Sequence, residues 1–293
     1  MLDPSPWVAG EGIRALESAG ISTLVGERAD EAARLNEAYF KWVRTSFPFV
    51  TLKYAMTADG KGATGSGSSS WVTGVEARKR VAHLRSTVDA VMVGIGTVLA
   101  DNPVLTSRPG DFGDPDLDPV HQPLRVILDS TARLPVDSRV ASEQEIAHTL
   151  VITTARAPEA RVERLRDLGL EIVAVDESEG HVDVSAALWL LGKRGILSVQ
   201  AECGGTLAAS LFQAGVVDKV LAFVAPKIVG GALAPSPVEG PGILIMGDAI
   251  VLRDVEWSIL GEDALLTGYV MPANVSGVAG AVDAAAPSLS LPV

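Results

Sequence analysis

Short apolar runs alternate with amphipathic segments through the middle of the chain. The apolar runs predict strands at 49–58, 90–93, 124–128, 150–153, 170–175, 196–201 and 220–225. Helices are predicted between them, at 98–100, 158–168, 184–191 and 207–214, with one more opened by a capping box at 73–76 and ending near Arg85. This alternation predicts an α/β fold with a mostly parallel central sheet flanked by helices.

The two ends of the chain follow different patterns. Periodic apolar positions predict helices at 10–18 and 29–43, with a strand at 21–25 between them. Near the other end, strands at 243–246, 248–255 and 265–270 follow one another without long helices, which favours antiparallel pairing. Residues 273–293 are almost all small, apolar or proline, so we expect a disordered tail there.

Two glycine corners separate a strand from a following helix. Gly94 and Gly96 follow the strand at 90–93, where a positive φ would suit glycine and Thr97 would cap the helix. Gly204 and Gly205 follow the strand at 196–201. Backbone N–H groups at two such helix starts suit a pyrophosphate, although α/β proteins also use these turns without any ligand.

Composition narrows the classes of function. The formal net charge of −12 argues against a general nucleic-acid surface. The first residues lack the basic and apolar regions of a signal peptide, and no segment is apolar for long enough to span a membrane. A single cysteine fits a reducing cytoplasm, and the four histidines show no spacing typical of a metal site. We therefore expect a cytoplasmic protein without a metal.

A series of motifs then occurs in a specific order. Residues 51–53 read Thr-Leu-Lys, 71–73 Trp-Val-Thr, 93–103 Val-Gly-Ile-Gly-Thr-Val-Leu-Ala-Asp-Asn-Pro, 128–130 Leu-Asp-Ser and 202–207 Glu-Cys-Gly-Gly-Thr-Leu. Over about residues 49–270 the chain resembles the reductase domain of bacterial riboflavin biosynthesis bifunctional deaminase–reductases. The resemblance implies a dihydrofolate-reductase-like fold over 49–272. Residues 1–48 resemble the end of the deaminase domain, whose zinc signature is absent.

The resemblance also implies an activity and a set of contacts. The family uses NADPH to reduce 5-amino-6-(5-phosphoribosylamino)uracil to its ribitylamino product. The implied NADPH contacts are Ala55, Trp71, Thr97, Asp101, Ser130, Gly204, Gly205, Thr206, Leu207, Ala208, Ala209 and Ser210. The implied substrate contacts are Ser69, Arg85, Leu105, Arg108 and Glu202. Two guanidinium groups, those of Arg85 and Arg108, suit a ribose phosphate.

The source of the proton in this reaction stays open at the level of sequence. Glu202 is our first hypothesis for a carboxyl at the reacting carbon, and Lys53 and Asp59 are alternatives. Other functions also remain open, namely another NADPH reductase of the same fold or a non-catalytic partner of a separate deaminase. We further expect a phosphorylated small molecule as substrate, no nucleic acid or membrane as partner, and a homodimer formed through an exposed strand near the C-terminus.

Overall fold

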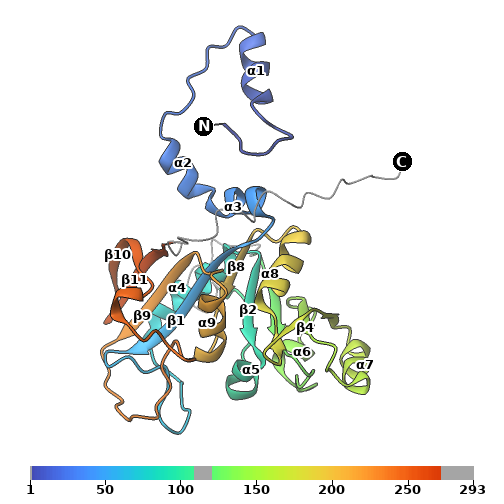
Figure 1. Ribbon diagram of the computed structural model, residues 1–293, viewed down its shortest axis with the longest axis vertical. Helices are drawn as coiled ribbons and strands as arrows, with labels where there is room; N and C mark the ends of the chain where they lie inside the picture. Colours follow the sequence, from blue (N-terminus) through green and yellow to red (C-terminus); the bar gives the residue numbers. More distant parts are fainter. Residues whose placement is uncertain (1, 109–120, 272–293) are drawn as a thin grey trace.

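The computed structural model describes residues 2–108 and 121–271, and its centre is a nine-stranded sheet (Figure 1). The strands are ordered β10-β11-β9-β1-β8-β2-β3-β4-β5. From β9 to β5 every neighbouring pair is parallel, whereas β11 pairs antiparallel with both β9 and β10. The bounds are β1 (Phe49–Thr57), β2 (Ala90–Gly94), β3 (Leu124–Leu128), β4 (Thr149–Thr153), β5 (Glu171–Ala174), β8 (Ser198–Ala201), β9 (Lys219–Ala225), β10 (Leu252–Leu260) and β11 (Asp263–Val270).

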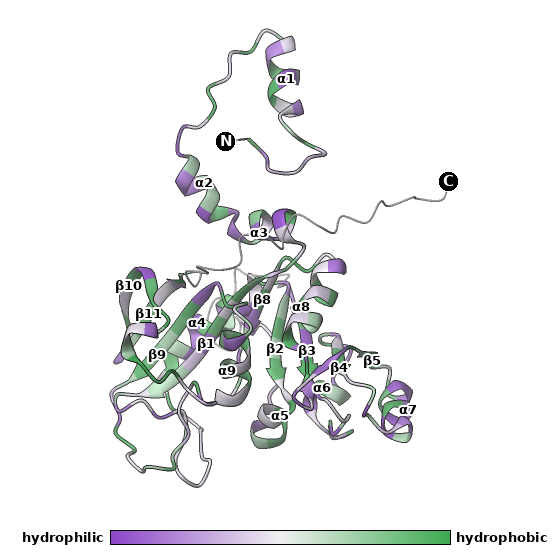
Figure 2. Ribbon diagram, in the orientation of Figure 1, coloured by the Kyte–Doolittle hydropathy of each residue, from purple (hydrophilic) through white to green (hydrophobic). Residues whose placement is uncertain are grey.

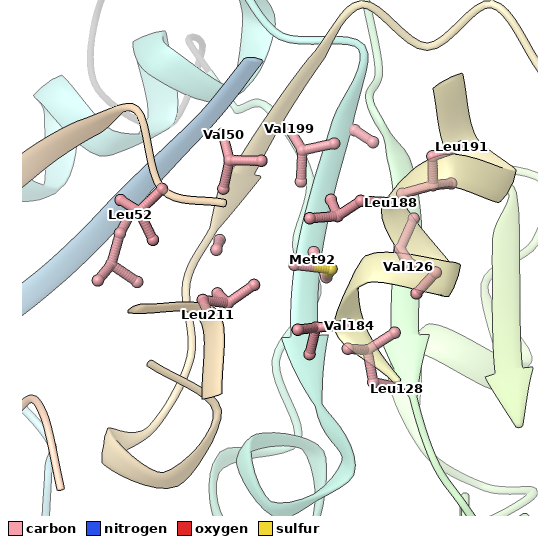
Figure 3. Close-up of a cluster of buried hydrophobic side chains, with 14 of the residues drawn as sticks. Val50, Leu52, Met92, Val126, Leu128, Val184, Leu188, Leu191, Val199 and Leu211 are labelled. Atoms are coloured by element: carbon pink, nitrogen blue, oxygen red, sulfur yellow. The ribbon is translucent and has the colours of Figure 1, made fainter. Parts of the chain in front are cut away.

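The central strands are apolar because helices cover both of their faces. Strand β4 is buried at every position, and β2 and β3 are buried at all but one. On one face, α8 (Val184–Lys193) and α9 (Gly205–Gln213) pack on the cluster of Val50, Met92, Val126, Leu188 and Leu211 (Figure 3). Parallel sheets occur almost only in this doubly covered form, since each strand must bury both sets of side chains.

A second helical layer covers the other face. Helices α5 (Ile95–Asp101), α6 (Arg139–Ser142) and α7 (Glu159–Asp167) pack on Val91, Ile127 and Val151. Helix α4 (Val75–Ser86) packs on Phe223 and Leu265 farther along the sheet. Val162 and Leu165 are the buried residues of α7, and most of the helix is hydrophilic (Figure 2). A two-stranded hairpin of β6 (Glu177–Ser178) and β7 (His181–Val182) precedes α8.

Residues 2–48 extend from one end of the sheet (Figure 1). They form α1 (Glu11–Ser18), α2 (Ala29–Leu35) and α3 (Glu37–Thr45). Helix α3 is fixed to the sheet by polar contacts: Lys219 Nζ lies 2.7 Å from Glu37 Oε1, and Lys41 Nζ contacts the Asp218 carboxylate at 2.5 Å. Trp42 Nε1 also donates to the carbonyl of Gly192, at 2.8 Å. None of the three helices has a buried residue.

The predicted fold class is confirmed: the sheet is mostly parallel, helices flank it, and the C-terminal strands are antiparallel. Two predicted strands are wrong. Residues 21–25 and 243–246 form no strand, since Leu24 is 79% and Leu244 97% exposed and neither segment lies beside a strand with which it could pair. The predicted disordered tail at 273–293 lies outside the described residues.

Three local predictions about helices are also wrong. The helix predicted at 29–43 is broken at Asn36, whose backbone leaves the helical region. The capping box at Thr73 does not form, because the helix starts one residue later and the N–H of Gly74 donates to Asp263 Oδ2 at 2.7 Å. Helix α5 starts at Ile95 rather than Val98, with Gly94 as its N-cap at φ −82°, so this corner needs no left-handed backbone.

In the described part of the chain, no helix combines the length and apolar character that crossing a bilayer requires.

Candidate active site

Neighbouring strands bring the candidate catalytic residues together at the carboxyl-terminal edge of the sheet. Lys53 lies on β1, and Glu202 directly follows β8, which pairs with β1 in parallel. The N–H of Glu202 donates to the carbonyl of Met92 on β2, at 2.9 Å, so the backbone of Glu202 continues the ladder. Arg85 comes from α4, on the face of the sheet opposite to α8 and α9.

The Glu202 carboxylate is the centre of this cluster. It accepts two parallel hydrogen bonds from the Arg85 guanidinium, at 2.7 and 2.8 Å, and one from Gln200 Nε2, at 2.9 Å. Lys53 Nζ lies 3.8 Å from its second oxygen. Burial alone would raise the pKa of Glu202, but the charge and hydrogen bonds of Arg85 outweigh it and lower the pKa to about 2. Glu202 is therefore an anion at neutral pH.

Arg85, an implied substrate contact, makes three hydrogen bonds within the chain. Its Nε and Nη2 bind Glu202, and its Nη1 donates to the carbonyl of Thr106, at 3.2 Å. Burial lowers the pKa of this guanidinium, and the Glu202 charge more than compensates. These bonds connect Arg85 to Glu202 and to the loop at 104–108, and its contact with the substrate stays a prediction.

Lys53 is a largely buried cation whose surroundings lower its pKa. Its side chain is 18% exposed, and its Nζ lies 5.7 Å from the centre of the Phe223 ring. Burial lowers the pKa of Lys53 below 10.5; the Glu202 charge opposes this shift and the Arg85 charge adds to it. A lysine with a lowered pKa gives up its proton more readily, which suits general acid catalysis near neutral pH.

The two glycine corners lie against each other. Strand β2 pairs with β8, and a Cβ on Gly94 would lie 3.5 Å from Leu207 Cδ2 in the first turn of α9. Gly204 is the N-cap of α9, and no side chain caps that end of the helix. A Cβ on Gly204 would meet nothing within 4 Å. A Cβ on Gly205, by contrast, would meet the Glu239 side chain and the carbonyl of Ser236, so the open space lies at Gly204, just before the first N–H groups of α9.

The remaining predicted cofactor residues of α9 differ in burial and in their hydrogen bonds. Ala208 and Ala209 are buried; Ala208 belongs to the core cluster at the sheet, and Ala209 lies beside Gly240. The Ser210 hydroxyl donates back to the carbonyl of Thr206, at 3.1 Å. The Thr206 hydroxyl donates to Glu239 Oε2 of the segment after β9, at 3.1 Å.

Contacts also connect residues predicted to bind the two ligands. Ser69 Oγ, on the substrate side, donates to Asp101 Oδ1 at the end of α5, at 2.9 Å. Trp71 is 69% exposed and stacks on the Arg78 guanidinium, at 4.4 Å. Ala55 lies two positions beyond Lys53 on β1, and Thr97 lies in the first turn of α5. These placements do not test the ligand contacts, which stay predictions.

Leu105, Arg108 and Ser130 lie at the ends of neighbouring loops. Leu105 is 2% exposed at φ 58°, and Arg108 is exposed three residues later. The Ser130 hydroxyl, just beyond β3, accepts from the N–H of Val182, at 3.0 Å.

Asp59 is arranged differently from the other two candidate proton donors. Its carboxylate accepts from the hydroxyl of Thr57 and from the N–H groups of Val229 and Gly230. The Thr57 hydroxyl and then the Gly230 N–H lower the pKa of Asp59 to about 2. These bonds fasten the loop after β9 to the turn after β1, which is a structural role.

Two site residues escaped the sequence analysis. Gln200 is 1% exposed and lies two residues before Glu202, on the same side of the strand; a buried amide in an apolar strand was the available signal. Arg125 is fully buried on β3 and donates to the carbonyls of Val104, Glu143 and Ala147. Its bond to Val104, at 3.4 Å, supports the loop that carries Leu105 and Arg108.

Within residues 2–108 and 121–271, no group of three or more histidine, cysteine or acidic side chains is placed to hold a metal ion. Cys203, beside Glu202, has a thiol whose pKa burial raises to about 12. A thiol with that pKa is a poor nucleophile at neutral pH.

Comparison with known proteins identifies the family. The family model described as RibD C-terminal domain matches residues 48–266. The chain belongs to the RibD C-terminal domain family. The riboflavin biosynthesis protein RibD of Actinobacillus pleuropneumoniae is 39% identical over 92% of this chain and 69% of its own length. The protein of that name from Synechocystis is 41% identical over 92% of this chain and 70% of its own length.

Solved RibD structures share the fold at similar coverage. Acinetobacter baumannii RibD superposes with a TM-score of 0.80 at 32% identity, over 92% of this chain and 71% of that one. A diaminohydroxyphosphoribosylaminopyrimidine deaminase/5-amino-6-(5-phosphoribosylamino)uracil reductase from Thermotoga maritima superposes with a TM-score of 0.73 at 31% identity, over 92% of this chain and 69% of that one. The chain therefore spans about 70% of the RibD proteins it matches, including their C-terminal domain.

The setting of Glu202 predicts a pH-dependent contribution to the stability of this RibD C-terminal domain. Its pKa is about 2 in the folded chain and 4.5 ordinarily, so the ionised carboxylate stabilises the fold above about pH 4.5 and loses this effect as the pH falls towards 2. Glu202→Gln removes the anion between two buried cations, which we expect to cost about 3–5 kcal/mol at neutral pH.

Urea unfolding between about pH 7 and pH 3 measures this effect. The free energy of unfolding of Glu202→Gln should be lower than that of the wild type at neutral pH, and it should fall less steeply between about pH 5 and pH 3. Glu171→Gln is the control, because Glu171 is exposed and pairs with Arg194 at the surface. Equal stabilities of the wild type and Glu202→Gln at neutral pH would contradict the assignment.

Proposed function

We propose that this chain catalyses the NADPH-dependent reduction of 5-amino-6-(5-phosphoribosylamino)uracil to 5-amino-6-(5-phosphoribitylamino)uracil, a step of riboflavin biosynthesis. The observation that carries the proposal is membership of the RibD C-terminal domain family over residues 48–266. The Thermotoga maritima relative is named as a reductase of this substrate. In the present chain, the cluster around Glu202 supplies the polar chemistry that such a reduction needs.

The N-terminus of α9 fits the pyrophosphate of NADPH. Its first N–H groups, at Gly205, Thr206 and Leu207, have no capping side chain, and the space at Gly204 is open, whereas the Glu239 side chain packs against Gly205. The positive end of the helix dipole favours phosphate groups at this position. NADPH, when bound, supplies the hydride that reduces C1 of the ribose. The protein's own part is to hold both partners within about 3–3.5 Å of each other.

Three side chains supply acid–base chemistry and charge. Lys53, with its lowered pKa, is the proton donor that we favour, because Glu202 and Asp59 both have pKa values of about 2 and hold no proton to donate near neutral pH. The Glu202 carboxylate lies 3.8 Å from Lys53 Nζ and keeps it protonated. It would also stabilise positive charge that develops on the ring-opened ribosylamine.

In this arrangement, Arg108 is the residue that binds the phosphate of the substrate. The Nε and Nη2 groups of Arg85 are directed at Glu202, and its Nη1 donates to the carbonyl of Thr106. Arg108 is exposed at the end of a loop whose earlier residues, Leu105 to Ser107, are buried. A buried loop with an exposed arginine at its end is suited to hold a charged group at the rim of a site.

A homodimer is a further part of the proposal. Strand β10 forms one edge of the sheet, and Val255, Trp257 and Ile259 on it are 42%, 62% and 73% exposed. An uncovered apolar edge strand is a ready template for pairing with a second copy. We also propose a cytoplasmic location, which suits the partly buried free thiol of Cys203.

The function is tested by the loss of NADPH absorbance on addition of the phosphoribosylaminouracil. We expect turnover with NADPH, slower turnover with NADH, and quenching of Trp71 fluorescence when NADPH binds. The same substrate without its phosphate should be reduced at a much lower kcat/KM. A chain that binds NADPH and reduces a pterin, but leaves the aminouracil untouched, would contradict the proposal.

The pH dependence of turnover tests the role of Lys53. As the proton donor, Lys53 must be protonated, so kcat should fall as the pH rises through its lowered pKa, below 10.5. Lys53→Met should reduce kcat about 10²–10⁴-fold with little change in the Kd of NADPH. Glu202→Gln removes the charge that keeps Lys53 protonated, so its alkaline limb should shift to lower pH. An alkaline limb that stays in place in this variant would contradict the proposed coupling.

Sedimentation equilibrium tests the dimer. We expect the wild type to sediment as a dimer and Trp257→Glu to shift toward monomer, because a charge on the apolar edge opposes pairing. Trp189→Glu is the control, since Trp189 is also 50% exposed but lies on α8, away from β10. Wild-type protein that remains monomeric at micromolar concentration would contradict this part of the proposal.

A further inference from the structure

The loop at 104–108 connects the cluster around Glu202 with Arg108, the proposed contact of the substrate phosphate. Its residues from 104 to 107 are each at most 6% exposed, whereas Arg108 is exposed. The loop forms neither helix nor strand, so its buried backbone groups need side-chain partners. Leu105 has a φ of 58°, which a leucine keeps only where its surroundings hold it. The groups that hold this loop therefore decide where Arg108 lies.

Two guanidinium groups hold the first part of the loop. Arg125 Nη1 donates to the carbonyl of Val104, at 3.4 Å. Arg85 Nη1 donates to the carbonyl of Thr106, at 3.2 Å. Because the guanidinium of Arg85 also binds Glu202, Thr106 is tied to the centre of the site. Neither of these two contacts reaches the last peptide bond of the loop.

Gln122, just before β3, contacts that last peptide bond. Its Nε2 donates to the carbonyl of Ser107, and its Oε1 accepts from the N–H of the same residue, both at 3.0 Å. Ser107 is 3% exposed, so one side-chain amide satisfies both of its buried backbone groups. The carbonyl belongs to the peptide bond between Ser107 and Arg108. The amide of Gln122 therefore fixes the backbone from which the arginine side chain projects.

We propose that Gln122 is a positioning residue for the substrate phosphate, because its amide holds Ser107 so that Arg108 meets the phosphate at the rim of the site. This inference rests on the proposed function. Arginine binds phosphate through a planar fork whose bonds depend on direction, so a shifted backbone loses these bonds even though the charge remains. An alanine at position 122 leaves two buried backbone groups without partners, and the loop has to move toward water to satisfy them.

Kinetics with the phosphorylated aminouracil and with its dephosphorylated form test the proposal. We expect Gln122→Ala to raise the KM of the phosphorylated substrate about tenfold and to change kcat less than about twofold, because binding is lost and hydride transfer is not. The Kd of NADPH should not change. With the dephosphorylated substrate, kcat/KM should stay within about twofold of the wild type, since it has no phosphate for Arg108 to bind. A general loss of packing would instead lower both kcat/KM values alike.

A double-mutant cycle asks whether Gln122 acts through Arg108. In an Arg108→Ala background, Gln122→Ala should have little further effect on the KM of the phosphorylated substrate, because the group that it positions is already absent. Gln122→Met keeps the length of the side chain without its hydrogen bonds, and it takes the place of Gln122→Ala if the alanine variant does not fold.

Gln144→Ala is the matched control. Gln144 is also a half-buried amide with backbone partners at both ends, since it donates to the carbonyl of Val140 and accepts from the N–H of Thr149. It should leave the ratio of the two kcat/KM values unchanged.

The proposal is overturned if Gln122→Ala lowers kcat/KM equally for the two substrates, or if its effect adds fully to that of Arg108→Ala. Failure of the proposed function would look different, because the wild type itself would then reduce neither form of the aminouracil. That result would overturn both proposals, whereas a wild type that prefers the phosphorylated form and a Gln122→Ala variant that keeps this preference would overturn the role of Gln122 alone.

Discussion

The structure depends on one buried carboxylate that two cations share. Glu202 is 8% exposed, and a lone anion at that depth would be costly to keep charged. Arg85 matches it with two parallel hydrogen bonds, and Lys53 adds a second positive charge at 3.8 Å. The three groups come from α4, β1 and the end of β8, so satisfying this charge fixes two layers of the domain relative to each other. It also leaves one net positive charge where the proposed substrate is anionic.

The parallel sheet explains why this cluster and the glycine corner of α9 are neighbours. Parallel strands all end at the same edge, so the residues after β8 and β2 meet there, together with the last part of β1. Ligands of open α/β sheets bind at that edge. The antiparallel strands β11 and β10 extend the sheet away from this edge chemistry and bury Leu265 against α4.

Strand positions were predictable from sequence because burial on two faces leaves a continuous apolar run, as in β2 and β4. Predictions failed where an apolar run had no partner: residues 21–25 and 243–246 remain exposed. The candidate residues were predictable as a set from motifs, but their pairing was not. Arg85 and Glu202 are 117 positions apart, and only the packing of α4 places this arginine against the carboxylate. The ionisation of Glu202, and with it the preference for Lys53 as the acid, follows from that packing.

The contacts of α3 bear on where a shortened form of this chain could begin. The family match starts at residue 48, yet Asp218 and Lys219, at the start of β9, find their partners in Lys41 and Glu37. Tyr269 on β11 hydrogen-bonds the same Glu37 carboxylate, at 2.7 Å. A fragment that begins at residue 48 would lack Lys41 and Glu37. Asp218 and Lys219, which are 24% and 20% exposed, would then have lost these counter-ions. The ion pairs that hold the start of β9 therefore reach back beyond the boundary of the family match, into α3.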